Sequence, residues 1–123
     1  MTKKEMAVTF LKMAASGEVR AAYDKFIDPH FIHHNLYFKG DRQSLMEAME
    51  AAHKKSPNKA IEVKQVLEEG DKVITYSQVV RQNPVDLNIA VVHIFKFKND
   101  RVIELWDVGQ QIPKDCPNEQ GAF

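Results

Sequence analysis

The chain has 123 residues, of which 44% are hydrophobic and 28% are charged, so size and composition predict one globular domain spanning residues 1–123. Lys and Arg total 17 and Asp and Glu total 17, and the resulting net charge of zero argues against a general nucleic-acid binder, which needs a basic surface. The single cysteine, Cys116, excludes an intrachain disulfide and a zinc site built on thiolates.

The sequence carries no signal for export or for membrane insertion. Its longest uncharged apolar stretch covers residues 89–95, far below the roughly 20 residues of a membrane span. The N-terminal lysines are not followed by the apolar run of a signal peptide. A lone thiol suits a reducing compartment, so we expect a cytoplasmic protein without a membrane partner.

The first half of the chain predicts three helices. Thr2 and Glu5 form a capping box, and apolar residues follow at helical spacing until Gly17. A shorter helix follows from Val19, and Pro29 ends it. Residues 29–40 are rich in aromatic side chains and histidine but follow neither the helical nor the strand period. Asp41 is the expected N-cap of the third helix, which residues 56–58 interrupt.

The second half predicts four strands. Ile61, Val63 and Leu67 alternate with charged residues, and a turn follows at residues 69–71. A second strand covers residues 72–81, and Gln82-Asn83-Pro84 breaks it. Residues 87–98 and 101–111 form the third and fourth strands. Because helices and strands are segregated along the chain, we expect an α+β fold with an antiparallel sheet.

The last hairpin can be registered from its side chains. A two-residue loop would pair Phe95 with Glu104, whereas a three-residue loop over residues 99–101 pairs apolar with apolar and charge with opposite charge. We therefore predict the second register, in which Lys96 faces Glu104. It pairs Phe97 with Ile103, Phe95 with Leu105 and Ile94 with Trp106.

That register places His93 directly opposite Asp107 on an otherwise apolar face, made of alternate residues from Leu87 to Phe97 and of Ile103 and Leu105. Paired residues have β-carbons ~4.5–5.5 Å apart. Such a pair can exchange a proton near neutral pH, as general acid–base catalysis requires. The alternative is a structural polar pair that fixes the strand register in a core.

The opposite face of the same strands is also apolar. Val92, Ile94, Trp106 and Val108 are mutually paired and form a patch rather than scattered surface residues. We expect a second copy of the chain to cover this patch in a homodimer.

The remaining polar clusters do not indicate a metal or a cofactor. His33 and His34 are adjacent, and neighbours in an extended segment point to opposite sides, so they are not expected to share an ion. His53 is expected near the C-terminal end of the third helix. No phosphate-binding loop or dinucleotide fingerprint occurs, so we expect neither a tightly bound metal nor a cofactor.

Three segments together resemble the SnoaL-like polyketide cyclases of the nuclear transport factor 2-like superfamily, over almost the whole chain. They are Phe31-Ile32-His33-His34-Asn35, Val91-Val92-His93-Ile94-Phe95 and Ile103-Glu104-Leu105-Trp106-Asp107-Val108. The chain departs from the family pattern at Leu36, where proline usually follows His-Asn, and at His33, where glutamine is common. The resemblance implies a conical, barrel-like α+β fold with three N-terminal helices packed on a curved, mainly antiparallel sheet.

The resemblance also implies a site. It makes Asp107 the general acid/base of an aldol-type ring closure, with His93 beside it and His34 entering the same pocket. The expected substrate-binding residues are Asn35, Tyr37, Phe31, Phe95 and Trp106, although Trp106 is equally a candidate for the dimer face. The expected ligand is a small hydrophobic or polycyclic carbonyl compound, and isomerisation, dehydration and epoxide opening would use the same site. The alternative is a non-catalytic, dimeric ligand-binding or protein-interaction domain, whose His–Asp pair would be packed over.

Overall fold

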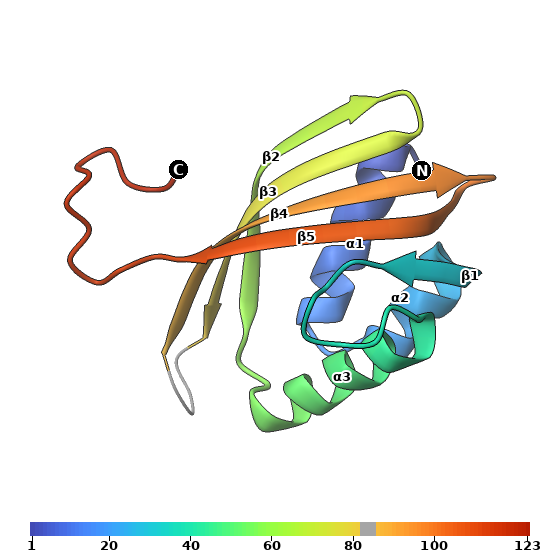
Figure 1. Ribbon diagram of the computed structural model, residues 1–123, viewed down its shortest axis with the longest axis horizontal. Coiled ribbons are helices and arrows are strands. Elements are labelled where there is room, and N and C mark those ends of the chain that lie inside the picture. Colours follow the sequence, from blue (N-terminus) through green and yellow to red (C-terminus); the bar gives the residue numbers. More distant parts are fainter. Residues whose placement is uncertain (82–85) are drawn as a thin grey trace.

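A computed structural model describes residues 1–81 and 86–123. Three helices and five strands follow one another along the chain: α1 (Lys3–Ala15), α2 (Val19–Phe26), β1 (Ile27–His33), α3 (Arg42–Lys55), β2 (Ala60–Glu69), β3 (Lys72–Arg81), β4 (Leu87–Lys98) and β5 (Arg101–Gln111). The strands form one sheet in the order β1-β5-β4-β3-β2, antiparallel except between β1 and β5. Figure 1 shows the helices gathered on one side of the curved sheet. The predicted α+β fold class is confirmed.

The helix ends form as the sequence predicts. Thr2 and Glu5 make both hydrogen bonds of the capping box at the start of α1. Asp41 caps α3 by accepting a 2.9 Å hydrogen bond from the Ser44 amide. Gly17 has a φ of 96°, and a β-carbon there would collide with the ring of His53. Glycine at this position therefore both ends α1 and admits the end of α3.

The sheet has a fifth strand that the sequence did not reveal. Residues Ile27–His33 form β1, which runs parallel to β5 with Ile32 opposite Glu104 and His33 opposite Leu105. The alternation is masked because Pro29 lies inside the strand and residues 28–30 between the buried Ile27 and Phe31 do not face the core. The prediction that this segment is irregular is therefore wrong.

The outer edge of β1 is taken up by contacts within its own neighbourhood. Pro29 has no N–H to donate. The amide of His30 donates to Oδ1 of Asp28 at 2.8 Å, and the amide of His33 donates to the carbonyl of Gly40 at 3.1 Å. The segment after β1 thus closes back on the strand.

The β4–β5 hairpin has the predicted pairing near the site but a shorter loop. Lys96 pairs with Glu104 and His93 with Asp107, as expected, whereas Phe97 pairs with Val102 rather than with Ile103. The loop is the two-residue Asn99-Asp100, with φ angles of 52° and 60°, which is the backbone of a tight hairpin turn. A register shift at Ile103 restores the predicted pairs, and Val102 takes the core position instead.

A second register shift, between Val63 and Gln65 in β2, turns Val66 toward the core and leaves Leu67 57% exposed. Leu67 therefore does not share a face with Ile61 and Val63, although the alternation of the three residues predicted that it would. The predicted break at Gln82-Asn83-Pro84 lies outside the described residues.

The core fills the space between the helices and the concave face of the sheet. Its largest fully buried side chains are Tyr23, Phe10, Phe31 and Phe95. The ring of Phe10 meets those of Tyr23 and Phe95 edge to face, with centroids 5.5 and 6.1 Å apart. Among the described residues, no helix is both long and apolar enough to cross a membrane.

Candidate active site

His93 and Asp107 form the directly opposed pair that the sequence predicts. Both line one cavity under the helices, on the concave side of the sheet. Nδ1 of His93 is enclosed and has no hydrogen-bond partner among the described residues. The side chains of His93 and Asp107 lie on paired residues, but no hydrogen bond joins them in the described part of the chain.

Burial lowers the pKa of His93 to about 4, and the negative charge of Asp107 only partly opposes that shift. The imidazole is therefore neutral at neutral pH. One of its ring nitrogens then carries a proton and the other accepts one. At neutral pH the ring is thus a hydrogen-bond partner, and the exchange of a proton between His93 and Asp107 stays a prediction.

Asn35 brings the loop after β1 to the carboxylate. Its Nδ2 donates to Oδ2 of Asp107 at 3.0 Å, while its Oδ1 accepts the amide of Tyr37 at 3.0 Å. The backbone N–H fixes which end of the amide is the acceptor, so Nδ2 must face Asp107. The expected contribution of Asn35 to the site is thus seen as a direct contact with the proposed base.

His33 holds this loop in place. Its ring is 5% exposed and stacks on Phe31. Nδ1 accepts the amide of Asn35 at 3.1 Å, so the proton sits on Nε2, which donates to the carbonyl of Lys39. From the sequence, we considered His33 as a possible metal ligand and as a departure from the family pattern, and we assigned this side chain no structural role. Its ring ties both ends of the loop to β1 through these two hydrogen bonds.

The cavity beside Asp107 measures about 170 Å³. Its wall is mostly apolar and comes from α1, α3, the loop after β1 and the two central strands. Besides the three polar residues, it includes Phe10, Leu45, Phe38 and Leu105. Phe38, which is 46% exposed, was not predicted to line the cavity, because residues 36–38 follow no helical or strand period.

His34 does not reach this cavity. It stacks on Trp106 with centroids 4.9 Å apart, and its Nε2 lies 2.7 Å from Oε2 of Glu104. Glu104 and Trp106 alternate with Leu105 and Asp107 along β5, so they lie on the opposite, outer face. The expectation that His34 and Trp106 contribute to the pocket is therefore not met.

The other predicted binding residues are also placed away from the cavity wall. Tyr37 is 90% exposed. Phe31 is buried in the core behind His33, and Phe95 supports the ring of His93 from the core at 6.0 Å between centroids. Of the predicted set, Asp107, His93 and Asn35 meet at one place.

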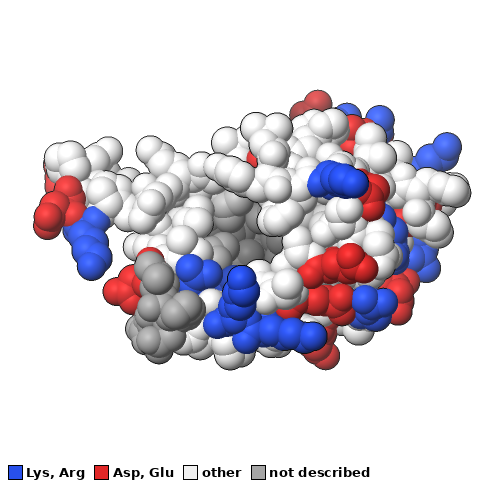
Figure 2. All heavy atoms as spheres, turned by 60° about the horizontal axis from the view of Figure 1, so that its bottom comes forward, with Lys and Arg blue, Asp and Glu red and all other residues white. Residues whose placement is uncertain are grey.

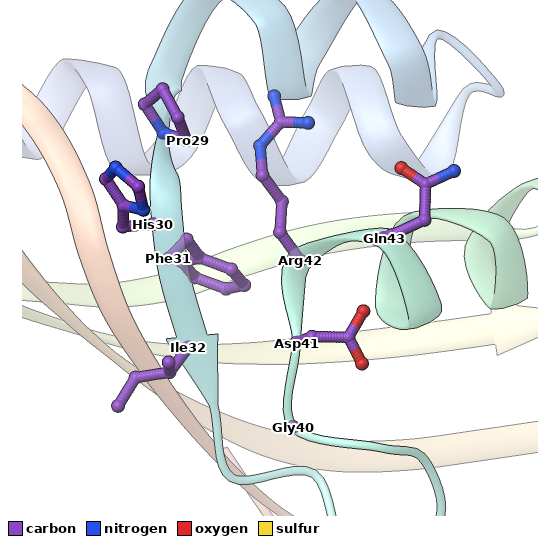
Figure 3. A pocket seen from close by; sticks show the side chains of 8 residues that line it. All are labelled: Pro29, His30, Phe31, Ile32, Gly40, Asp41, Arg42 and Gln43. Atoms are coloured by element: carbon purple, nitrogen blue, oxygen red, sulfur yellow. The ribbon is translucent and has the colours of Figure 1, made fainter.

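A larger depression lies elsewhere on the surface of the described residues. It measures about 790 Å³ and lies between β1 and the start of α3, where Arg42 and Phe31 contribute to its wall. Figure 3 shows that His30 and Ile32 point to the other side of β1 from Phe31. None of the three residues that meet at the cavity lines this depression, so the smaller cavity is the better candidate. Within the described residues, no three His, Cys, Asp or Glu side chains are grouped as a metal site would require.

Comparisons with known proteins agree with this geometry. The family description "SnoaL-like polyketide cyclase" matches residues 5–114. A candidate polyketide cyclase from Acidithiobacillus ferrooxidans superposes with a TM-score of 0.74 at 14% identity, covering 89% of this chain and 92% of its own. An uncharacterised cystatin-fold protein from Novosphingobium aromaticivorans gives 0.76 at 16% identity, covering 88% and 98%. IdmH from Streptomyces antibioticus, another candidate polyketide cyclase, gives 0.72 at 12% identity, covering 89% and 93%. These structures share the fold, and no curated protein matches the sequence.

Proposed function

Because this chain belongs to the SnoaL-like polyketide cyclase family, we propose that it catalyses a cofactor-independent acid–base reaction on a small carbonyl compound. The observation that carries the proposal is the hydrogen bond from Asn35 to Asp107 at the wall of an apolar cavity that His93 also lines. A carboxylate placed in this way can act on a bound molecule while the apolar wall excludes water.

The two oxygens of Asp107 have different surroundings. Oδ2 accepts from Asn35, whereas Oδ1 has no hydrogen-bond partner among the described residues. We assign Oδ1 the removal of a proton from a carbon next to the substrate carbonyl. The protonated carboxyl then returns that proton elsewhere on the substrate, so that no cofactor is needed.

His93 is suited to the complementary role. As a neutral imidazole it can donate its remaining N–H to the oxygen that gains charge when the enolate forms. A neutral imidazole carries no extra proton that it could lose to Asp107, so it keeps its N–H for the substrate oxygen. Aldol-type ring closure is the reaction we favour, and double-bond isomerisation, or elimination as lyase chemistry, would use the same groups.

The open volume next to Asp107 supports a ligand site over a purely structural pair. A polar pair that served only to fix the strand register would be packed over by side chains. Here a cavity of about 170 Å³ reaches both residues. The carbonyl compound must be compact and largely apolar, because the wall offers few polar groups besides Asn35, His93 and Asp107.

We further propose that the protein acts in the cytoplasm as a homodimer joined through the outer face of the sheet. Val108 is 72% exposed there, next to Trp106, Ile94 and Val92 on the paired strands. An apolar patch of this kind is typical of an interface between subunits.

Deuterium exchange tests the proton transfer directly. In D2O, the wild-type protein should speed deuterium uptake into the methyl group of 2-acetylnaphthalene, followed by NMR. Asp107→Asn keeps the shape of the side chain but removes the base, so the enzyme-dependent rate should fall by about 10²–10⁴-fold.

Glu104→Gln is the matched control, because it makes the same chemical change on the outer face of the same strand. Its exchange rate should equal that of the wild type. Exchange no faster than in buffer, or an Asp107→Asn variant as fast as the wild type, would overturn the proposal.

A further inference from the structure

A second cavity adjoins the first. It measures about 150 Å³, and its wall comes from α1, α3 and the strands β2, β3 and β4, with Lys59 just before β2. Leu11, Met49 and His93 line both cavities. The ring of His93 thus stands between a space that reaches Asp107 and a space that extends away from it.

Lys59 is the only fully charged side chain among the residues that line the second cavity, and the rest of this wall is apolar except for His93. Lys59 is half-buried and makes no ion pair within the described residues. Burial lowers its pKa, and the positive charge of Arg81 lowers it further. An ammonium group in these surroundings lacks the negative partner that its burial calls for.

The surface on this side of the molecule carries charges of both signs. Figure 2 brings the α3 side forward and shows a hollow there, with blue Lys and Arg side chains along its lower border and red Asp and Glu side chains beside them. A preference for an anion therefore has to come from Lys59 in the cavity wall rather than from the surrounding surface.

We propose that Lys59 binds a carboxylate at the far end of the substrate, so that the enzyme takes an amphipathic carbonyl compound. The carbonyl lies between Asp107 and His93, the apolar body passes His93, and the carboxylate meets Lys59. A single cation in the wall matches a monoanion better than a phosphate ester. This inference rests on the proposed role of Asp107, because that role fixes which end of the substrate reacts.

The test compares 6-acetyl-2-naphthoate with its methyl ester, which differ only in the charge at one end. Binding is measured by fluorescence titration at low salt. The wild-type protein should bind the carboxylate at least about tenfold more tightly than the ester, as expected for a charge-assisted hydrogen bond. Lys59→Met should bind both equally, and Lys59→Arg should restore the preference.

Lys55→Met is the matched control, since Lys55 is an exposed lysine at the end of α3 and lines neither cavity. It should keep the wild-type preference. A preference that survives in Lys59→Met, or that falls equally in Lys55→Met, would overturn the inference. The exchange assay on 2-acetylnaphthalene, which has no carboxylate, separates this failure from a failure of Asp107 as the base.

Discussion

His93 should make the stability of the protein depend on pH. Its pKa is about 4 in the folded chain, against 6.5 for an ordinary histidine. Between pH 6.5 and pH 4, His93 is protonated in the unfolded chain but not in the folded chain. The free energy of unfolding therefore falls as the pH falls through this range. At pH 7.5 neither state is protonated, and this loss is absent.

The size of the effect follows from the shift. Each pKa unit corresponds to about 1.4 kcal/mol, so the full difference approaches about 3 kcal/mol at pH 4. At pH 5, protonation of His93 in the unfolded chain lowers the free energy of unfolding by about 2 kcal/mol. That loss is a large fraction of the stability of a small domain.

Urea unfolding at pH 7.5 and at pH 5.0 measures this change in the free energy of unfolding. His93→Gln cannot gain a proton, so it should lose about 2 kcal/mol less than the wild type between the two pH values, whatever its stability at pH 7.5. His30→Gln is the control, because His30 is exposed, and it should behave as the wild type. If His93→Gln and the wild type lose the same free energy, the neutral buried imidazole is refuted, and with it the hydrogen-bond donor assigned to His93.

Two further predictions concern assembly and the loop after β1. Trp106→Glu should convert a wild-type dimer to a monomer in sedimentation velocity, because it places a charge in the outer apolar patch; a wild type that is already monomeric at micromolar concentration would contradict the proposed dimer. His33→Leu removes the acceptor for the Asn35 amide and the donor to Lys39, so amide hydrogen exchange over residues 34–40 should rise and deuterium uptake by 2-acetylnaphthalene should slow. Unchanged protection of the loop would show that His33 does not hold Asn35.

The sequence was sufficient to place His93 opposite Asp107, because alternation and charge pairing fix a hairpin register over several residues. It was not sufficient for the loop, where a tight two-residue turn and a bulge at Ile103 produce the same pairs farther along. The strand β1 was not predicted, because it is stabilised by parallel pairing with β5, which is distant in sequence.

The misplacement of His34 has a different origin. The family resemblance implied that His34 and Asn35 both line the pocket. Adjacent residues in an extended chain, however, point to opposite sides. Asn35 turns in to Asp107, and His34 turns out to Trp106. The hydrogen bonds of His33 decide which of the two faces the cavity, and no period in the sequence reports them.

The closed outer edge of β1 also bears on how the protein avoids aggregation. An open strand edge is a template on which another chain can add a strand and begin a fibril. At β1 the amides of His30 and His33 are already bonded, and Pro29 has none. The opposite edge, β2, carries the charged residues Glu62 and Glu68. Strand addition is therefore opposed at these positions of both edges, which leaves the outer face of the sheet as the surface for self-association.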